Sequence, residues 1–265
     1  MSTVYFSENG NREHFVDQIL DIFAASLQNA KKVFLKPNIV SYEHYPTTTH
    51  PEVLEAVLKR LSDCEVVVGD APAIDAGRSG KILKESPLNE VCRRYNNKLV
   101  NLYSEKMKTV WSPRGYKIKV STLPLDCDFV ISLPVLKIHG MIGLSGALKN
   151  QFGYLSRQDR FLMHCKLKNI NKGIAEVNAA IPTNLFIIDA LETMIKAQEC
   201  RHGGCPAKLN TMIAGTDPVS LDIFGLQLLK KLEPKFEHKK NQASKYIEYA
   251  SDYGLGKKDF NVKEV

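Results

Sequence analysis

The chain of 265 residues lacks the short motifs that most readily identify an enzyme. It contains no G-x-x-x-x-G-K-[ST] phosphate loop, no G-x-G-x-x-G dinucleotide fingerprint, no G-x-S-x-G nucleophile elbow and no H-E-x-x-H zinc helix. Each of these motifs holds backbone amides or side chains at the spacing that its chemistry needs. Their absence argues against P-loop, Rossmann, α/β-hydrolase and zincin chemistry.

Long apolar runs are also missing. No segment approaches the roughly 20 residues that a membrane-spanning helix needs. The first residues, MSTVYFSENGNREHF, have neither the basic start nor the apolar stretch of a secretory signal. We therefore expect a cytoplasmic protein with no membrane partner.

Cysteine is sparse and unpatterned. Six cysteines are scattered, none forms a C-x-x-C pair, and no C-x2-C-x2-C-x3-C run is present. In a reducing compartment they are most simply free thiols. The only close pair, Cys200 and Cys205, is either half of a metal or redox site or two ordinary loop thiols. The four close ligands of most zinc sites favour the second interpretation.

Charge is moderately one-sided. Lys and Arg number 36 against 29 Asp and Glu, which gives a formal net charge of +7. This balance suits an anionic metabolite or an acidic protein partner. One short local excess exists, which we interpret as a solvated helix face: Lys230, Lys231, Lys235, Lys239 and Lys240. No aromatic-rich RNA-binding motif accompanies it, so nucleic acid is not an expected partner.

Short apolar runs alternate with helical patterns along the chain. This alternation predicts an α/β fold with a mainly parallel sheet and helices on both faces. We expect a single domain over residues 1–265, with two closely packed lobes as an alternative arrangement. The predicted strands are Val33–Val40, Val66–Val68, Leu99–Leu102, Tyr116–Ser121, Phe129–Val135, Leu185–Asp189 and Thr211–Gly215. The predicted helices are Pro51–Ser62, Ile82–Tyr95 with a break near Pro87, Leu167–Ala180, Pro218–Leu232 with Asp217 as N-cap, and Gln242–Tyr253 before Gly254.

The segment VISLPVLKIHGMIGLSGALKNQFG, residues 130–153, concentrates chemistry at the exit of one predicted strand. Ligands of open α/β sheets bind beyond the carboxyl ends of the strands. Lys137 and His139 alternate, so their side chains can share a face. We take both as candidate catalytic residues. Candidate ligand-binding residues follow in the same segment, with Ser145 also expected to cap a helix: Gly143, Ser145, Gly146, Lys149 and Asn150.

Other predicted strands end in similar polar groups. Lys36 and Asn38 end the first one and can bind and orient an anion. Thr48 and Thr49 precede a helix start, which forms either an anion site or, through Thr49, a simple N-cap. Asp70 follows the next strand. Further candidate ligand-binding residues come from loops and helix starts: Arg78, His164, Arg201 and His202. Asp222 is a candidate partner for a site lysine, and the sequence leaves any metal unknown.

Several stretches together resemble one family. KPN with TTHP, GDAP, LPVLKIHGMIGLSGALKNQFG, RHGG-x-P and TDPVSLD occur in order between about residue 31 and residue 257. They resemble the DUF362 family, a domain of unknown function. The resemblance implies an association with ferredoxin-like iron–sulfur modules. This chain has no self-contained ferredoxin-type cluster motif, so its cofactors remain unknown and any cluster would come from a separate partner.

Two functions follow as hypotheses. The first is an enzyme, with redox-linked chemistry favoured by the family association, that binds a carboxylate- or phosphate-bearing small molecule at the carboxyl edge of the sheet. The second is a non-catalytic binding or scaffold domain for a cofactor or for an acidic iron–sulfur, ferredoxin-like redox partner.

Overall fold

The α/β fold expected from the sequence is confirmed by a computed structural model. It describes residues 1–233 and 237–265, and side chains at all of these positions except 237–239. The described residues form one eight-stranded sheet in the order β12-β1-β11-β10-β7-β2-β3-β4. These strands are β1 (Ser2–Ser7), β2 (Lys32–Pro37), β3 (Glu65–Asp70), β4 (Leu99–Asn101), β7 (Phe129–Leu133), β10 (Leu185–Ile195), β11 (Cys205–Gly215) and β12 (Phe260–Glu264).

Five adjacent strands of this sheet run parallel. They are β10, β7, β2, β3 and β4. Strand β11 pairs antiparallel with both β10 and β1, and β12 runs parallel to β1 at the edge. The carboxyl ends of β7, β2 and β3 therefore meet at one edge of the sheet.

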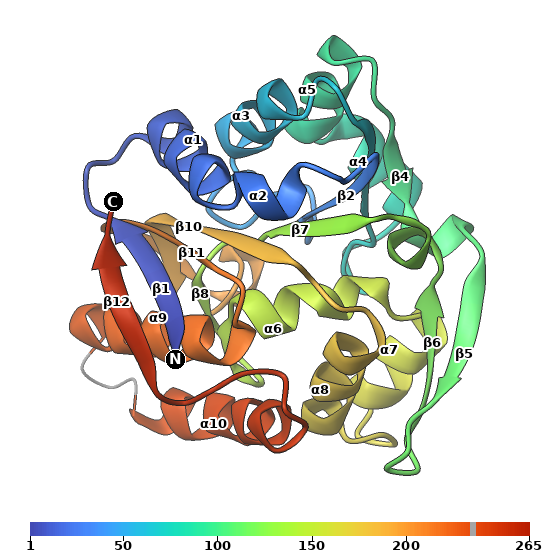
Figure 1. Cartoon of the computed structure of the whole chain (residues 1–265). Coiled ribbons are helices and arrows are strands. Elements are labelled where there is room, and N and C mark those ends of the chain that lie inside the picture. Colours follow the sequence, from blue (N-terminus) through green and yellow to red (C-terminus); the bar gives the residue numbers. More distant parts are fainter. Residues whose placement is uncertain (234–236) are drawn as a thin grey trace.

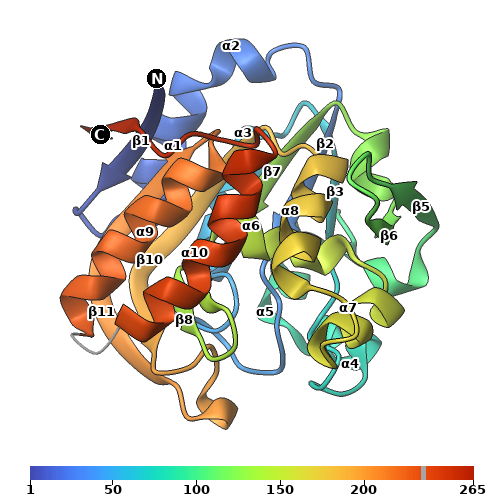
Figure 2. The same cartoon turned by 90° about the horizontal axis from the view of Figure 1, so that it is seen from below.

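Helices cover both faces (Figures 1 and 2). One layer holds α1 (Arg12–Ile22), α3 (Pro51–Arg60), α4 (Ser79–Glu85) and α5 (Pro87–Arg94), with the short α2 (Ala24–Leu27) beside them. The other holds α6 (Ala147–Asn150), α7 (Arg157–His164), α8 (Ile170–Ala180), α9 (Pro218–Leu232) and α10 (Glu237–Asp252). Two small hairpins lie outside the main sheet: β5 (Met107–Trp111) with β6 (Lys117–Ser121), and β8 (Lys137–His139) with β9 (Gly143–Ser145).

Strand β2 shows why the sheet is buried on both faces. Val33 and Leu35 belong to the core under α1, α3 and α5, whereas Phe34 points into the core under α6, α8 and α9. Each residue is 0% exposed. A continuous apolar run is the sequence signature of a strand covered by helices on both sides.

Helix boundaries follow the expected capping chemistry in several places. Ser86 accepts a hydrogen bond from the Leu88 N–H and Pro87 opens α5, so the predicted break near Pro87 is confirmed. Asp217 caps α9 by accepting from the Val219 and Ser220 N–H groups, as predicted. Gly254 has φ +74°, the left-handed conformation expected after a helix end.

Other expectations about local structure are wrong. Helix α8 begins at Ile170 because Asn169 caps it, and the separate helix α7 precedes it. Strand β10 continues to Ile195, and β11 begins at Cys205 inside the predicted loop. His50, not Thr49, caps α3. The long β10–β11 ladder explains the misjudged loop, since its antiparallel pairing extends the strands beyond their apolar cores.

Three charge-related expectations can also be compared with the structure. Lys230 and Lys231 are exposed at the end of α9, in keeping with a solvated face. Lys235 and the side chain of Lys239 lie outside the described residues. Within the described part of the chain, no helix is both long and apolar enough to span a membrane.

The Asp217 cap generates a stability prediction. Its carboxylate also accepts from the Lys257 N–H, so it joins the start of α9 to the segment after α10. We expect Asp217→Ala to lower the free energy of unfolding by about 1–2 kcal/mol, because three backbone donors lose their acceptor. Urea denaturation would measure this loss. Asp217→Asn should retain much of the stability, and equal destabilisation by both variants would contradict a capping role.

Candidate functional site

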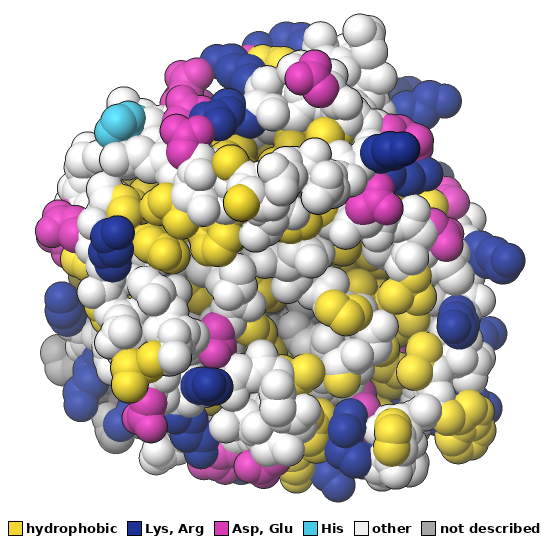
Figure 3. Space-filling model, in the orientation of Figure 1, with side chains coloured by type: hydrophobic (Ala, Val, Ile, Leu, Met, Phe, Trp, Pro, Cys, Tyr) yellow, Lys and Arg dark blue, Asp and Glu magenta, His cyan; other side chains and the backbone are white. Residues whose placement is uncertain are grey.

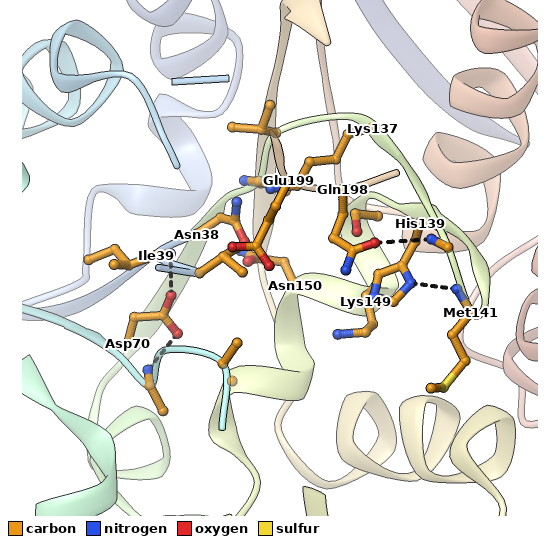
Figure 4. A pocket seen from close by; sticks show the side chains of 18 of the residues that line it. Asn38, Ile39, Asp70, Lys137, His139, Met141, Lys149, Asn150, Gln198 and Glu199 are labelled. Atoms are coloured by element: carbon orange, nitrogen blue, oxygen red, sulfur yellow. Dashed lines mark hydrogen bonds between the residues drawn. The ribbon is translucent and has the colours of Figure 1, made fainter. Parts of the chain in front are cut away.

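A cavity of about 460 Å³ opens at the carboxyl ends of β2, β3 and β7. Its walls come from the loops that follow these strands, the β8–β9 hairpin, α6, α7 and the segment 197–202 (Figure 4). This is the edge of an α/β sheet at which ligands normally bind. The volume falls within the range of small-molecule sites.

A buried ion pair forms the floor of the cavity. The Lys36 ammonium lies 2.5 Å from Asp70 Oδ1, and the two residues are 1% and 2% exposed. Burial lowers the pKa of Lys36, and the Asp70 charge opposes that shift. Asp70 also accepts hydrogen bonds from the Ile39 and Ala71 N–H groups. The pair therefore fixes the loops that leave β2 and β3.

Two glycines of the 130–153 segment permit close packing around this floor. A Cβ on Gly153 would lie 2.8 Å from Lys36 Nζ and would overlap Asp70 Oδ1. A Cβ on Gly146 would overlap a carboxylate oxygen of Asp222. Only glycine lets the α6 region approach these groups so closely.

Asp222 has a different role from the one expected. It is 0% exposed and accepts from the Ala147 and Leu148 N–H groups, so it caps α6 from the neighbouring helix α9. Burial raises its pKa to about 7, and the two backbone donors oppose that shift. The expected lysine pairing of Asp222 is wrong. The expected Ser145 cap is also wrong, because α6 begins at Gly146 without a cap from its own segment.

Lys137 lies at the start of the β8–β9 hairpin. Its side chain is 1% exposed and donates to the Thr47 carbonyl. Burial lowers its pKa to about 8, and the negative charges of Glu199, Glu43 and Asp70 partly offset this effect. Lys137 can therefore exchange a proton near neutral pH.

A second lysine has weaker support. Lys149 of α6 makes no hydrogen bond or ion pair with any described residue, and its ammonium lies 4.2 Å from the Phe152 ring centroid. Burial lowers its pKa to about 7, and Arg160, Lys137 and Lys36 lower it further. Crowding by like charges makes this wall strongly receptive to an anion.

Arg160 of α7 completes the positive wall. The side chain is 6% exposed, Nη1 donates to the Ala71 carbonyl at 2.8 Å, and the buried Nε has no hydrogen-bond partner. No acidic side chain of the described residues forms an ion pair with it. A buried guanidinium without an acid is costly unless a ligand supplies the negative charge.

The cavity histidines can be assigned tautomers from their neighbours. His139 Nδ1 accepts from the Met141 N–H at 3.2 Å, so a neutral His139 carries its proton on Nε2. His164 Nδ1 lies 2.7 Å from the Arg160 carbonyl, which can only accept, so Nδ1 carries the proton. Burial lowers the pKa of His164, and Lys149 and Arg160 contribute to that shift. His164 Nε2 is then an acceptor.

The rim of the cavity joins three segments. Gln198 Oε1 accepts from the Gly140 N–H at 3.0 Å, which ties the 197–202 segment to the β8–β9 hairpin. Arg201 bridges Glu199 at 2.9 Å and Asp75 at 3.1 Å. Glu43 accepts from the Cys200 and Arg201 N–H groups. Loops from three parts of the sequence are thereby held over one opening.

Most residues predicted for the site line this cavity. They are Lys36, Asn38, Asp70, Lys137, His139, Ser145, Gly146, Lys149, Asn150, His164 and His202. Asn38 and Asn150 donate their amide N–H groups to the carbonyls of Thr47 and Lys36, which leaves each amide oxygen without a described partner. Their roles in binding remain predictions.

The other predicted residues lie outside the cavity wall. Thr48 donates to the Glu43 carbonyl and Thr49 to the Leu133 carbonyl, so both hydroxyls serve the loop after β2. Arg78 stands at the start of α4. Gly143 has φ +86° in the hairpin turn. Arg201 supports the rim through its two ion pairs.

Four wall residues were not identified from the sequence: Asp75, Arg160, Gln198 and Glu199. A signal existed for Arg160. Ser156 and Asp159 exchange hydrogen bonds as a capping pair, and this S-x-x-D pattern predicts a helix that begins at Arg157. Arg160 and His164 would then share one helix face.

The cysteines do not fit a cluster site. Cys92 is buried in α5, whereas the others lie on separate elements or in loops, and all six are free. Among the side chains that the structure describes, no group of three or more His, Cys, Asp or Glu residues could hold a metal ion.

Comparison with known proteins identifies the family. Residues 33–227 match the domain of unknown function DUF362, and the chain belongs to this family. The predicted family membership is therefore confirmed. Within 211 aligned residues the chain is 25% identical to a thylakoid-associated protein of Synechocystis sp., covering 77% of this chain and 64% of that protein.

A solved structure shares the fold. The lactate racemase apoprotein of Thermoanaerobacterium thermosaccharolyticum superimposes with a TM-score of 0.55 at 13% identity, covering 85% of this chain and 56% of that chain. The present chain thus spans less than two thirds of the length of both relatives. At this identity the likeness concerns the fold alone.

The close packing at Gly153 generates a prediction. Gly153→Ala should lower the free energy of unfolding by roughly 1–3 kcal/mol, because the added methyl group collides with the buried Lys36–Asp70 pair. Thermal and urea unfolding would measure the change. Gly80→Ala is a matched control, since a Cβ there meets nothing within 4 Å and the residue lies in α4. A loss no larger than that of the control would contradict the packing argument.

Proposed function

We propose that the protein is an enzyme that binds a carboxylate- or phosphate-bearing small molecule in the cavity at the carboxyl ends of β2, β3 and β7. One observation supports this more than any other. Lys137, Lys149 and Arg160 bring three cationic groups to the cavity wall, and none forms an ion pair with an acidic side chain of the described residues.

The acids of the cavity are already engaged. Asp70 pairs with Lys36, and Asp75 and Glu199 both pair with Arg201. Their charges are therefore largely balanced before any ligand enters. The remaining excess is positive and lies in a partly enclosed space, where its attraction for an anion is stronger than in bulk water.

Acid–base groups stand on the same wall. A neutral His139 presents an Nε2–H donor, and burial gives Lys137 a pKa of about 8. Groups that titrate near neutral pH are suited to proton transfer. These two residues are the candidate catalytic groups, and the positive wall would hold the charge of the substrate.

The reaction class is a weaker inference. Redox-linked chemistry is supported only by the family association with iron–sulfur proteins. The fold neighbour is named for a racemase of lactate, a small carboxylate, but fold likeness alone does not transfer chemistry. A non-catalytic role as a binding domain for a cofactor or an acidic redox partner remains the alternative.

Native mass spectrometry of protein purified without oxygen, compared with its denatured mass, tests the proposal directly. We expect a bound anion that is released on denaturation, or binding of acetate, malonate, phosphate or sulfate when these are added. A bare chain that binds none of these anions would contradict the proposal. Salt-sensitive binding of an acidic ferredoxin in place of a small anion would favour the alternative.

Substitutions assign the roles. Lys137→Ala should weaken anion binding about tenfold or more, because one charge-assisted hydrogen bond is lost. His139→Ala should reduce turnover more than binding if the imidazole transfers protons. Lys84→Ala, on the exposed face of α4, is the control for an unspecific loss of positive charge. The proposal fails if both cavity variants retain full binding and turnover.

A further inference from the structure

Three side chains on one wall of the cavity surround a single aromatic ring. The Lys149 ammonium lies 4.2 Å from the Phe152 ring centroid and the Arg160 guanidinium carbon lies 5.4 Å from it. The His164 ring centroid lies 5.8 Å from the same point, in an edge-to-face arrangement. Phe152 therefore holds these three groups as one cluster, here called the Phe152 cluster.

The positions of the three groups are set by their helices. Arg160 and His164 are four residues apart on α7, so they lie on one face of that helix. Lys149 comes from α6, and Phe152 follows it in the next turn of chain. His164 is further held by its Nδ1 contact with the Arg160 carbonyl at 2.7 Å. The arrangement is thus built before any ligand arrives.

Each group retains an unused hydrogen-bonding atom. Arg160 Nε is buried and has no partner, in a side chain that is only 6% exposed. Lys149 has no hydrogen-bond or ion-pair partner among the described residues. His164 Nε2 is an acceptor in the neutral tautomer. Unpartnered polar groups at this degree of burial are unusual in a protein interior and indicate a missing partner.

The charge of the Phe152 cluster differs from that of the cavity floor. Lys36 has Asp70 beside it at 2.5 Å, and Lys137 is stabilised by the charges of Glu199 and Glu43. Lys149 and Arg160 repel each other with no comparable acid between them, as the lowered pKa of Lys149 reflects. A singly charged head group would leave one of the two cations unpaired.

We propose that the Phe152 cluster is a subsite for a doubly charged tetrahedral oxyanion, the head group of a phosphate monoester or phosphonate. This inference rests on the proposed function and names the substrate class. A tetrahedral dianion offers several oxygens to one Arg fork, one ammonium and one imidazole. A dicarboxylate would instead separate its two charges along a carbon chain, away from this single ring.

The remaining cavity wall supports an organic ester over inorganic phosphate. Ile39, Val40, Ile74 and Met141 line the same cavity and give it an apolar side. A space of about 460 Å³ is much larger than one phosphate ion. The organic part of the ligand would occupy this apolar side while its charged group contacts the Phe152 cluster.

Binding of a dianion should recruit protons. The groups that face Lys149 are Arg160, His164, Lys137, Lys36 and Asp70, and those that face His164 include Lys149, Arg160 and Asp75. Burial and the neighbouring cations hold the pKa of Lys149 at about 7 and lower the pKa of His164. A bound dianion favours the charged forms of both, so affinity is greatest below the Lys149 pKa and falls as pH rises through it.

Two probes of equal shape but different charge test the proposal. Sulfate stays doubly charged across the working pH range, and methanesulfonate is a tetrahedral anion with a single charge. Calorimetric titration at constant ionic strength should give at least about tenfold tighter binding for sulfate. Sulfate affinity should also decrease by up to about tenfold per unit above pH 7, with proton uptake detected as a dependence on buffer ionisation enthalpy.

Variants locate the effect. Lys149→Met keeps the stem over Phe152 but removes the charge, and it should abolish most of the preference for sulfate and its pH dependence. Arg160→Lys retains the charge without the planar fork and should weaken sulfate binding about tenfold. Lys263→Met, exposed on the edge strand β12, should leave both unchanged. Circular dichroism and unfolding curves would confirm that each variant is folded.

The outcomes separate this inference from the proposed function. Equal affinity for sulfate and methanesulfonate, or a preference for sulfate that survives in Lys149→Met, would overturn the dianion subsite. If acetate or malonate binds and requires Lys137 while sulfate does not bind, the proposed function stands and the Phe152 cluster inference fails. If none of the four anions binds, both fail.

Discussion

The buried ion pair between Lys36 and Asp70 is the constraint on which the site depends. It joins the last turns of two neighbouring parallel strands, and the same carboxylate accepts the N–H groups of Ile39 and Ala71, so both departing loops are fixed by one group. The region around α6 can approach only because Gly153 has no side chain. Removing one partner would leave a buried charge, which is far more destabilising than the net value of an intact pair.

This floor also explains where the positive charge is concentrated. Asp70 is occupied by Lys36, and the acids of the rim are occupied by Arg201, so the nearby cations have no internal partner. The molecular surface in Figure 3 shows Lys and Arg interspersed with Asp and Glu on that face. The imbalance that matters is therefore inside the cavity. Burying unpaired cations opposes folding, and a ligand that binds the folded state would offset that penalty.

The sequence predicts the parts of the site that follow from strand exits. Lys36, Asn38, Asp70, Lys137 and His139 line the cavity because each follows or lies near the end of a strand that folds to the same sheet edge. Arg160 and Glu199 belong to segments whose position depends on tertiary packing, and no local pattern marks them as site residues. The same limit applies to Asp222, whose carboxylate caps a helix 75 residues away in sequence. Gly146 and Gly153 stand out in the sequence, but the groups that they admit can be identified only from the fold.

A shared fold does not determine which anion is bound. The strand-end edge of an α/β sheet accommodates many ligands, and its chemistry comes from the side chains that the loops place there. In this chain the floor pairs lysine with aspartate, whereas the opposite wall gathers Lys149 and Arg160 around Phe152 without an acid. That asymmetry gives the cavity an orientation. A ligand with one charged end and one apolar end can satisfy the Phe152 cluster and the apolar wall at the same time, while His139 and Lys137 stand beside whatever lies between them.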